Sequence, residues 1–115
     1  MQIKIYHNPR CSKSRQTMQL LQEHDIEPEV IEYLNNPPDK TTLRKILKQL
    51  GLSPRDLMRC KENEYKDNHL DDPSLTDDQL IDAMLKYPKL IERPIVITDK
   101  GAAIGRPPEK VLEVL

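Results

Sequence analysis

The sequence predicts an α/β fold, a mixed sheet covered by helices with a helical insertion between its two halves. Three observations lead to this prediction. The chain opens with strand, helix and strand patterns, it closes with two strands and a helix, and residues 39–87 between them carry helical and loop patterns. The 115 residues contain no repeat, low-complexity tract or linker, so we expect one domain spanning residues 1–115.

The first half predicts two parallel strands. Residues 3–6 alternate and are rich in β-formers, which is typical of a short strand. Turn-forming residues follow at positions 7–10, and a helical segment starts near residue 12. Residues 29–34 predict the second strand. Because a helix joins the two strands, we expect a right-handed crossover and parallel pairing.

The middle of the chain predicts a group of helices. Apolar residues recur at helical spacing over residues 43–50, and Gly51 follows as a C-terminal cap. Shorter helices are predicted from Pro54 to Met58 and again after Thr76, ending before Pro88. The residues expected to cap these helices are Thr41 or Asp39, Ser53, and Thr76 with Gln79 in a capping box.

The second half predicts an antiparallel pair and a final helix. Residues 95–98 form an apolar run that predicts a strand buried on both faces. Asp99-Lys100-Gly101 is a hairpin turn signal, and residues 102–105 predict the partner strand. Pro107-Pro108 would start the last helix, with Val111, Leu112 and Leu115 as its apolar residues.

Composition excludes several classes of protein. Lys plus Arg is 18 and Asp plus Glu is 19, so a formal net charge of −1 offers no global basic field for nucleic acid or anionic lipid. No apolar run approaches a membrane span, and the first residues lack a signal-peptide pattern. Two cysteines are too few for a disulfide scaffold. We therefore expect a cytoplasmic monomer with reduced thiols, no metal site and no nucleic-acid or membrane partner.

Cys11 is the first candidate for chemistry. It follows a strand and a turn at the predicted start of a helix, where free backbone N–H groups and the helix dipole favour a thiolate. Arg10, Lys13 and Arg15 add positive charge nearby, and His7 and Ser14 are in reach for hydrogen bonds. The alternative is a cysteine with no role.

The second thiol is expected to be a bystander. Residues 11–14 read Cys-Ser-Lys-Ser, so a Cys-x-x-Cys dithiol motif is absent there. Cys60 stands far along the chain, in or after a short helix, and spacing alone does not bring it to Cys11.

Three arginines form the second signal. Arg59 follows the short helix, Arg93 precedes Pro94 before the buried strand, and Arg106 precedes Pro107. A guanidinium group keeps its charge and has a planar fork that matches an oxyanion. Each arginine taken alone is more typical of an ordinary surface position than of a binding site.

These residues together resemble a known family. Residues 7–15 read His-Asn-Pro-Arg-Cys-Ser-Lys-Ser-Arg, which resembles the signature of glutaredoxin-dependent arsenate reductases, in the branch with Cys-Ser-Lys-Ser-Arg. The likeness continues through residues 33–34, 37–38, 57–59, 76–81, 93–98 and 105–107, and so covers essentially the whole chain. It implies a thioredoxin-like fold with a helical insertion, and a cis bond before Pro94.

The resemblance also implies roles. Cys11 matches the nucleophile that attacks arsenate, and Arg59, Arg93 and Arg106 match the arginines that hold the oxyanion. His7, Ser14 and Pro94 match supporting residues. Glutathione would be the reductant, glutaredoxin the partner and arsenical resistance the setting, with no bound cofactor.

Two alternatives keep the same scaffold. One is a monothiol oxidoreductase that removes glutathione from proteins, a reaction compatible with Cys-x-x-Ser but with less need for three arginines. The other is a non-enzymatic redox-regulatory interaction module, which would leave the Cys11 pKa near its ordinary value.

Overall fold

The structure, a computed structural model, describes residues 2–115. The chain divides into two compact units. The sheet unit comprises the residues up to Asn36 together with Arg93–Leu115, and the helical unit comprises Pro37–Glu92. The helical unit includes the predicted block of residues 39–87. That the whole chain acts as one domain stays a prediction.

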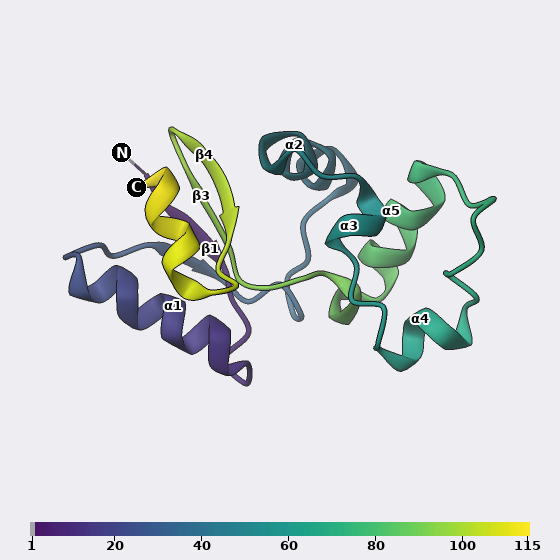
Figure 1. Ribbon diagram of the computed structural model, residues 1–115, viewed down its shortest axis with the longest axis horizontal. Coiled ribbons are helices and arrows are strands. Elements are labelled where there is room, and N and C mark those ends of the chain that lie inside the picture. Colours follow the sequence, from purple (N-terminus) through teal and green to yellow (C-terminus); the bar gives the residue numbers. More distant parts are fainter. Residues whose placement is uncertain (1) are drawn as a thin grey trace. The chain divides into compact units, whose positions relative to one another are not determined.

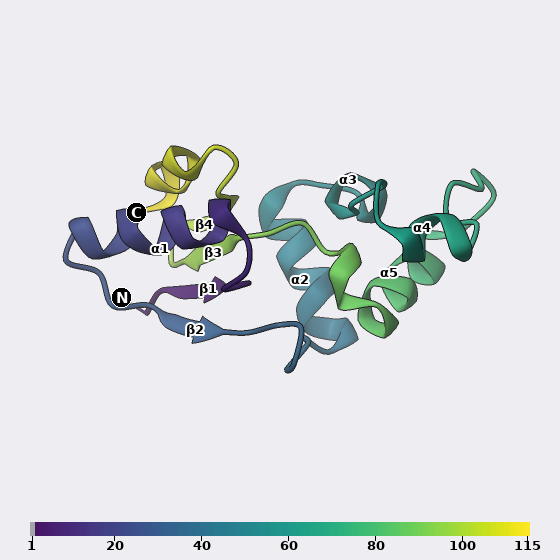
Figure 2. The same cartoon turned by 90° about the horizontal axis from the view of Figure 1, so that it is seen from below.

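The sheet unit contains the predicted mixed sheet. Its strands are β1 (Lys4–Tyr6), β2 (Glu29–Ile31), β3 (Ile95–Thr98) and β4 (Gly101–Ile104), in the spatial order β2-β1-β3-β4 (Figures 1 and 2). β1 pairs with β2 in parallel, and the β1–β3 and β3–β4 pairs are antiparallel. The β-α-β and β-β-α halves therefore meet at the central pair, β1 and β3.

The second strand is shorter than predicted. It ends at Ile31 rather than at residue 34, because the chain turns immediately afterwards. The Glu32 carbonyl accepts hydrogen bonds from the backbone N–H groups of Asn35 and Asn36, at 3.0 Å each. Tyr33 is nonetheless 1% exposed, so its apolar character reflects burial within a turn rather than within a strand.

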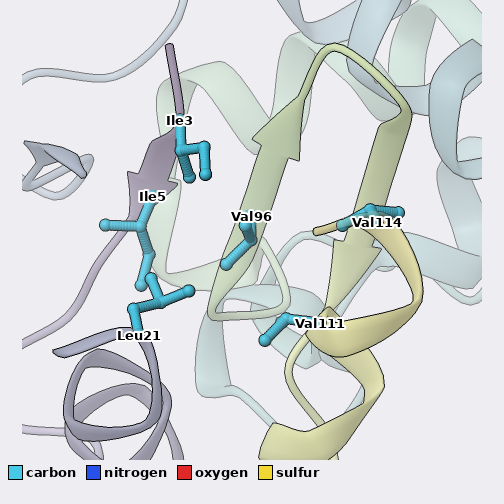
Figure 3. Packing of buried hydrophobic residues seen from close by; sticks show 6 residues of the cluster. All are labelled: Ile3, Ile5, Leu21, Val96, Val111 and Val114. Carbon is cyan, nitrogen blue, oxygen red and sulfur yellow. The ribbon is translucent and has the colours of Figure 1, made fainter. Parts of the chain in front are cut away.

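Helix α1 (Ser12–Glu23) and the C-terminal helical turn η2 (Pro108–Val114) contribute to one core with the sheet. Figure 3 shows side chains from β1, β3, α1 and η2 pointing toward one another. Burying such aliphatic groups is worth roughly 1.5–3 kcal/mol per side chain before entropy is counted. The buried members of this cluster are Ile3, Ile5, Leu21, Val96, Val111 and Val114.

The last helix is a 3₁₀ helix, where the sequence suggested an ordinary one. Residues three apart lie on the same face of a 3₁₀ helix. This spacing lets Val111 and Val114 both enter the core, while Leu112 stays 40% exposed. The Thr98 hydroxyl donates to the Val114 carbonyl at 2.5 Å, which ties the end of the segment to β3.

The helical unit contains α2 (Lys40–Leu50), α3 (Pro54–Leu57), α4 (Asn63–Asp67), α5 (Asp77–Lys86) and the 3₁₀ turn η1 (Pro88–Leu90). α5 packs against α2, α3 and η1. The turn η1 was not predicted, because it is a single turn of three residues. The core residues of this unit with the least exposure are Leu43, Ile46, Leu57, Leu80, Met84, Leu90 and Ile91.

The predicted caps of these helices are confirmed. Asp39 rather than Thr41 caps α2, accepting from the Thr42 N–H at 2.7 Å. Gly51 ends that helix in the left-handed region at φ 70°. Ser53 caps α3, and Thr76 forms the capping box of α5 with Gln79.

Candidate active site around Cys11

A tight turn before α1 places Cys11. The Asn8 carbonyl accepts from the Cys11 N–H at 3.0 Å, and the Asn8 side chain accepts from the Arg10 N–H at 3.0 Å. Cys11 is the N-cap of α1, with extended backbone at φ −94° and ψ 124°. The first turn, Ser12–Arg15, carries no acidic side chain. The thiol therefore faces the positive end of the helix with no nearby carboxylate in that turn.

The surroundings of the Cys11 sulfur favour a thiolate. Burial raises the pKa of the thiol, but hydrogen bonds from the Ser14 and Lys13 backbone N–H groups and from the Arg93 guanidinium outweigh it. The net result is a pKa below the ordinary value of 9.0. The predicted thiolate thus has its physical basis in the helix start and in a distant arginine.

Two of the three predicted arginines meet at the sulfur. Arg106 Nη2 donates to Cys11 Sγ at 3.5 Å, and Arg106 Nε donates to the Arg93 carbonyl at 2.9 Å. The bonds from Arg93 to Pro94 and from Arg106 to Pro107 are both cis, so the expectation for Pro94 is confirmed. The structure therefore brings Cys11, Arg93 and Arg106 together.

His7, which is half-buried, forms a pair with the buried Ser14. Ser14 Oγ accepts from the Asn8 N–H at 3.0 Å and lies 2.5 Å from His7 Nδ1. Burial lowers the pKa of His7, with the Arg15 charge acting in the same direction and the Glu32 charge opposing it. When the neutral ring carries its proton on Nε2, Nδ1 accepts a hydrogen bond from the Ser14 hydroxyl. This pair holds the loop that carries Cys11.

Arg59 belongs to the helical unit, and its contacts there are with carboxylates. Its Nη1 lies 2.7 Å from Glu92 Oε1, and its Nε lies 3.4 Å from Glu62 Oε1. Its backbone N–H donates to the Leu90 carbonyl at 2.7 Å. The oxyanion role of Arg59 stays a prediction.

Cys60 is also part of the helical unit and is exposed. Its sulfur lies 3.8 Å from the Met58 carbonyl oxygen, to which the thiol donates. Its expected bystander role stays a prediction.

The sequence did not reveal the part that Asn8 plays. Asn8 is 8% exposed and holds both the Cys11 turn and the Ser14 hydroxyl. The signal was present, since an asparagine before a proline often starts such a turn. Arg15 is one of the basic residues expected to add positive charge near Cys11, and its side chain donates to the Pro9 carbonyl at 2.9 Å.

Two wider features of the described chain complete the picture. Across residues 2–115, no helix is long and apolar enough to cross a membrane. Within the same residues, no group of three or more His, Cys, Asp or Glu is arranged to hold a metal ion.

The fold and the site define a class. The chain presents a thiol at a helix start with two guanidinium groups beside it, on the β-α-β then β-β-α sheet of a thioredoxin-like fold. The model of the ArsC family matches residues 6–114. The chain belongs to this family.

Relatives agree over nearly the full length. The chain is 58% identical over 115 residues to the uncharacterized protein YfgD of Escherichia coli, covering 99% of this chain and 97% of that protein. It is 50% identical over 115 residues to an arsenate reductase of Neisseria meningitidis, covering 99% and 98%. The solved structure of an arsenate reductase from Vibrio cholerae superposes with a TM-score of 0.97 at 52% identity, covering 100% and 98%. The thioredoxin-like fold is thereby confirmed.

Proposed function

We propose that this protein is an arsenate reductase that converts arsenate to arsenite, with Cys11 as its nucleophile. The observation that carries the proposal is the Cys11 sulfur at the start of α1, 3.5 Å from the Arg106 guanidinium. A thiolate that attacks an oxyanion must overcome charge repulsion, and fixed cations beside the sulfur reduce it. The relatives from Neisseria meningitidis and Vibrio cholerae, both named arsenate reductases, support the choice of arsenate.

In the first step, the Cys11 thiolate attacks arsenic(V) of arsenate. A sulfur–arsenic bond forms, an arsenic–oxygen bond breaks, and the departing hydroxyl takes up a proton from a buffer acid and leaves as water. Arsenic stays in the +5 state. Arg93 and Arg106 hold the remaining oxygens, and Arg59 is proposed as the third oxyanion ligand.

In the second step, glutathione attacks the adduct as the reductant. A disulfide forms between Cys11 and glutathione, and the electron pair of the sulfur–arsenic bond passes to arsenic. Arsenic(V) becomes arsenic(III) and leaves as arsenite, and the thiol proton goes to an arsenite oxygen. Sulfur is oxidised by the same two electrons.

In the third step, glutaredoxin exchanges its thiol with this mixed disulfide and regenerates the Cys11 thiolate. No cofactor has to stay bound through the cycle. The need for reduced glutathione favours a cytoplasmic setting. The proposed cycle involves no nucleic-acid or membrane partner. His7 and Ser14 act by holding the loop that carries Cys11, and Pro94 acts from its position between Arg93 and the start of β3.

Reductant omission tests the proposal most sharply. Arsenate-dependent NADPH oxidation is measured with glutathione, glutaredoxin and glutathione reductase, then again with each thiol component left out. We expect turnover only with the complete system. Turnover without glutaredoxin would contradict the third step. Removal of glutathione from a protein mixed disulfide, with no arsenate turnover, would favour the monothiol oxidoreductase instead.

A further inference from the structure

Gly105 lies where β4 ends and the site begins. It is buried, and its N–H donates to the Pro94 carbonyl at 2.9 Å. A Cβ at this position would lie 2.8 Å from Pro94 Cγ and 3.3 Å from Thr17 Cγ2, with Thr17 Oγ1 closer still. Contacts below 3.0 Å are essentially never found for a real Cβ. Its φ lies outside the left-handed region, so the position requires glycine for space and not for conformation.

The two neighbours of Gly105 have little freedom to retreat. Thr17 is 0% exposed on α1, and its hydroxyl donates to the Lys13 carbonyl at 2.9 Å. A β-branched side chain in a helix is stiff at χ1. Pro94 is buried, and its ring permits no rotation away from the contact. An added methyl group would therefore displace the backbone of residue 105.

Such a displacement passes directly to the next residue. The Arg106 N–H donates to the Ile104 carbonyl at 2.9 Å, so the turn that contains Gly105 is tight. The guanidinium of Arg106 spans two acceptors, the Arg93 carbonyl at 2.9 Å and the Cys11 sulfur at 3.5 Å. A guanidinium group that makes two hydrogen bonds tolerates a backbone shift less well than one that makes a single hydrogen bond.

We propose that Gly105 is a positioning residue: its missing side chain lets the end of β4 close against Thr17 and Pro94, so that Arg106 reaches the Cys11 sulfur. The consequence for oxyanion binding rests on the function proposed above. The contact between Arg106 and the Cys11 sulfur does not depend on that function. A measurement made without arsenate therefore tests the contact separately from oxyanion binding.

The test compares Gly105→Ala with Gly51→Ala. Gly51 lies in the helical unit at φ 70° with no atom within 4 Å of an added Cβ, so alanine there strains the backbone and leaves Arg106 in place. The readout is the pH dependence of Cys11 alkylation by iodoacetamide, measured on the Cys11 peptide by mass spectrometry. We expect Gly105→Ala to raise the midpoint by about one pH unit, a tenfold change in the thiolate equilibrium. Gly51→Ala is expected to lower thermal stability without moving the midpoint.

A second pair of variants identifies the contact. Thr17→Ala removes both Thr17 atoms that meet the new Cβ, and only the Pro94 contact remains. Thr17→Val keeps the size of the side chain. In the Gly105→Ala background, we expect Thr17→Ala to return the midpoint part of the way and Thr17→Val to leave it raised, each measured against its own Gly105 parent.

An unchanged midpoint in folded Gly105→Ala would overturn the proposal, and so would an equal rise in Gly51→Ala. If Gly105→Ala does not fold, the double variant with Thr17→Ala replaces it. A midpoint above that of Thr17→Ala alone then supports the proposal, and an equal midpoint overturns it. Failure of both to fold would assign Gly105 to the fold as a whole and overturn the positioning role.

Discussion

Cys11 and Cys60 each follow an arginine in the sequence, yet their surroundings differ. Cys11 caps a twelve-residue helix and receives a hydrogen bond from Arg106, which is 95 positions away. Cys60 donates to a carbonyl, and the arginine before it lies against Glu92 and Glu62. The contacts of the two sulfurs are with Arg106 and with the Met58 carbonyl, and in neither case with the preceding arginine. The backbone position of a thiol, more than the charge next to it in sequence, decides whether it is presented as a nucleophile.

The largest expected effect separates the two cysteines. Cys11→Ser should lower arsenate turnover by a factor on the order of 10³ or more, because a serine hydroxyl does not ionise to supply the nucleophile. Cys60→Ser should retain most of the turnover. The coupled NADPH assay measures both. Equal losses in the two variants would remove the distinction between the thiols.

The next effect compares Arg106, which contacts the Cys11 sulfur, with Arg10, which only precedes Cys11 in the sequence. Arg106→Lys should lower kcat/KM for arsenate roughly 10²-fold, because a single ammonium group does not replace a fork that reaches both Arg93 and Cys11. Arg10→Lys is the matched control, since the Arg10 side chain is exposed and keeps its charge in the variant. Steady-state kinetics over a range of arsenate concentrations give both values. A larger loss in Arg10→Lys would show that adjacency matters more than the observed contact.

A smaller effect is expected at Arg59. If Arg59 binds the oxyanion as proposed, Arg59→Lys should raise KM for arsenate about tenfold, since it loses bidentate geometry but keeps its charge. The alkylation midpoint of Cys11 should stay where it is. A variant that loses thermal stability with an unchanged KM would assign Arg59 to its ion pairs with Glu92 and Glu62.

The smallest expected effect is on stability. The pKa of Cys11 is lowered in the folded protein, so between that pKa and 9.0 the unfolded chain binds more protons. The resulting stabilisation is present in full above 9.0 and is lost as pH falls through the folded value. In a Cys60→Ser background, the free energy of unfolding should therefore exceed that of Cys11→Ser by a margin that grows with pH over this window. Urea denaturation at several pH values measures the margin, and a constant margin would contradict the lowered pKa.

The helix caps show what short-range patterns predict well. The Thr76 capping box, the Ser53 cap and the Gly51 terminus each depend on residues within a few positions, so a local pattern is sufficient. The length of β2 and the 3₁₀ character of Pro108–Val114 depend on what the segments pack against, and both differed from expectation. Val111 and Val114, three residues apart, both pack into the core, and this spacing can be recognised only once the core is known.

The site divides in the same way. The position of Cys11 at the start of a helix follows from neighbouring residues, and it was predicted. The approach of Arg106 to the Cys11 sulfur requires the antiparallel pairing of β3 with β4. Only the family resemblance indicated that Arg106 belongs to the same site as Cys11. The close contact of Gly105 with Thr17 joins two elements nearly the length of the chain apart, and no local pattern signals it.

A thiolate titration tests the central claim most directly. The ultraviolet absorbance of the thiolate is followed against pH in Cys60→Ser, with the double Cys11→Ser, Cys60→Ser variant subtracted. We predict a single Cys11 midpoint below 9.0 that rises when Arg106→Lys is added. A midpoint at or above 9.0 would contradict the claim that the start of α1, Arg93 and Arg106 together hold Cys11 as a thiolate.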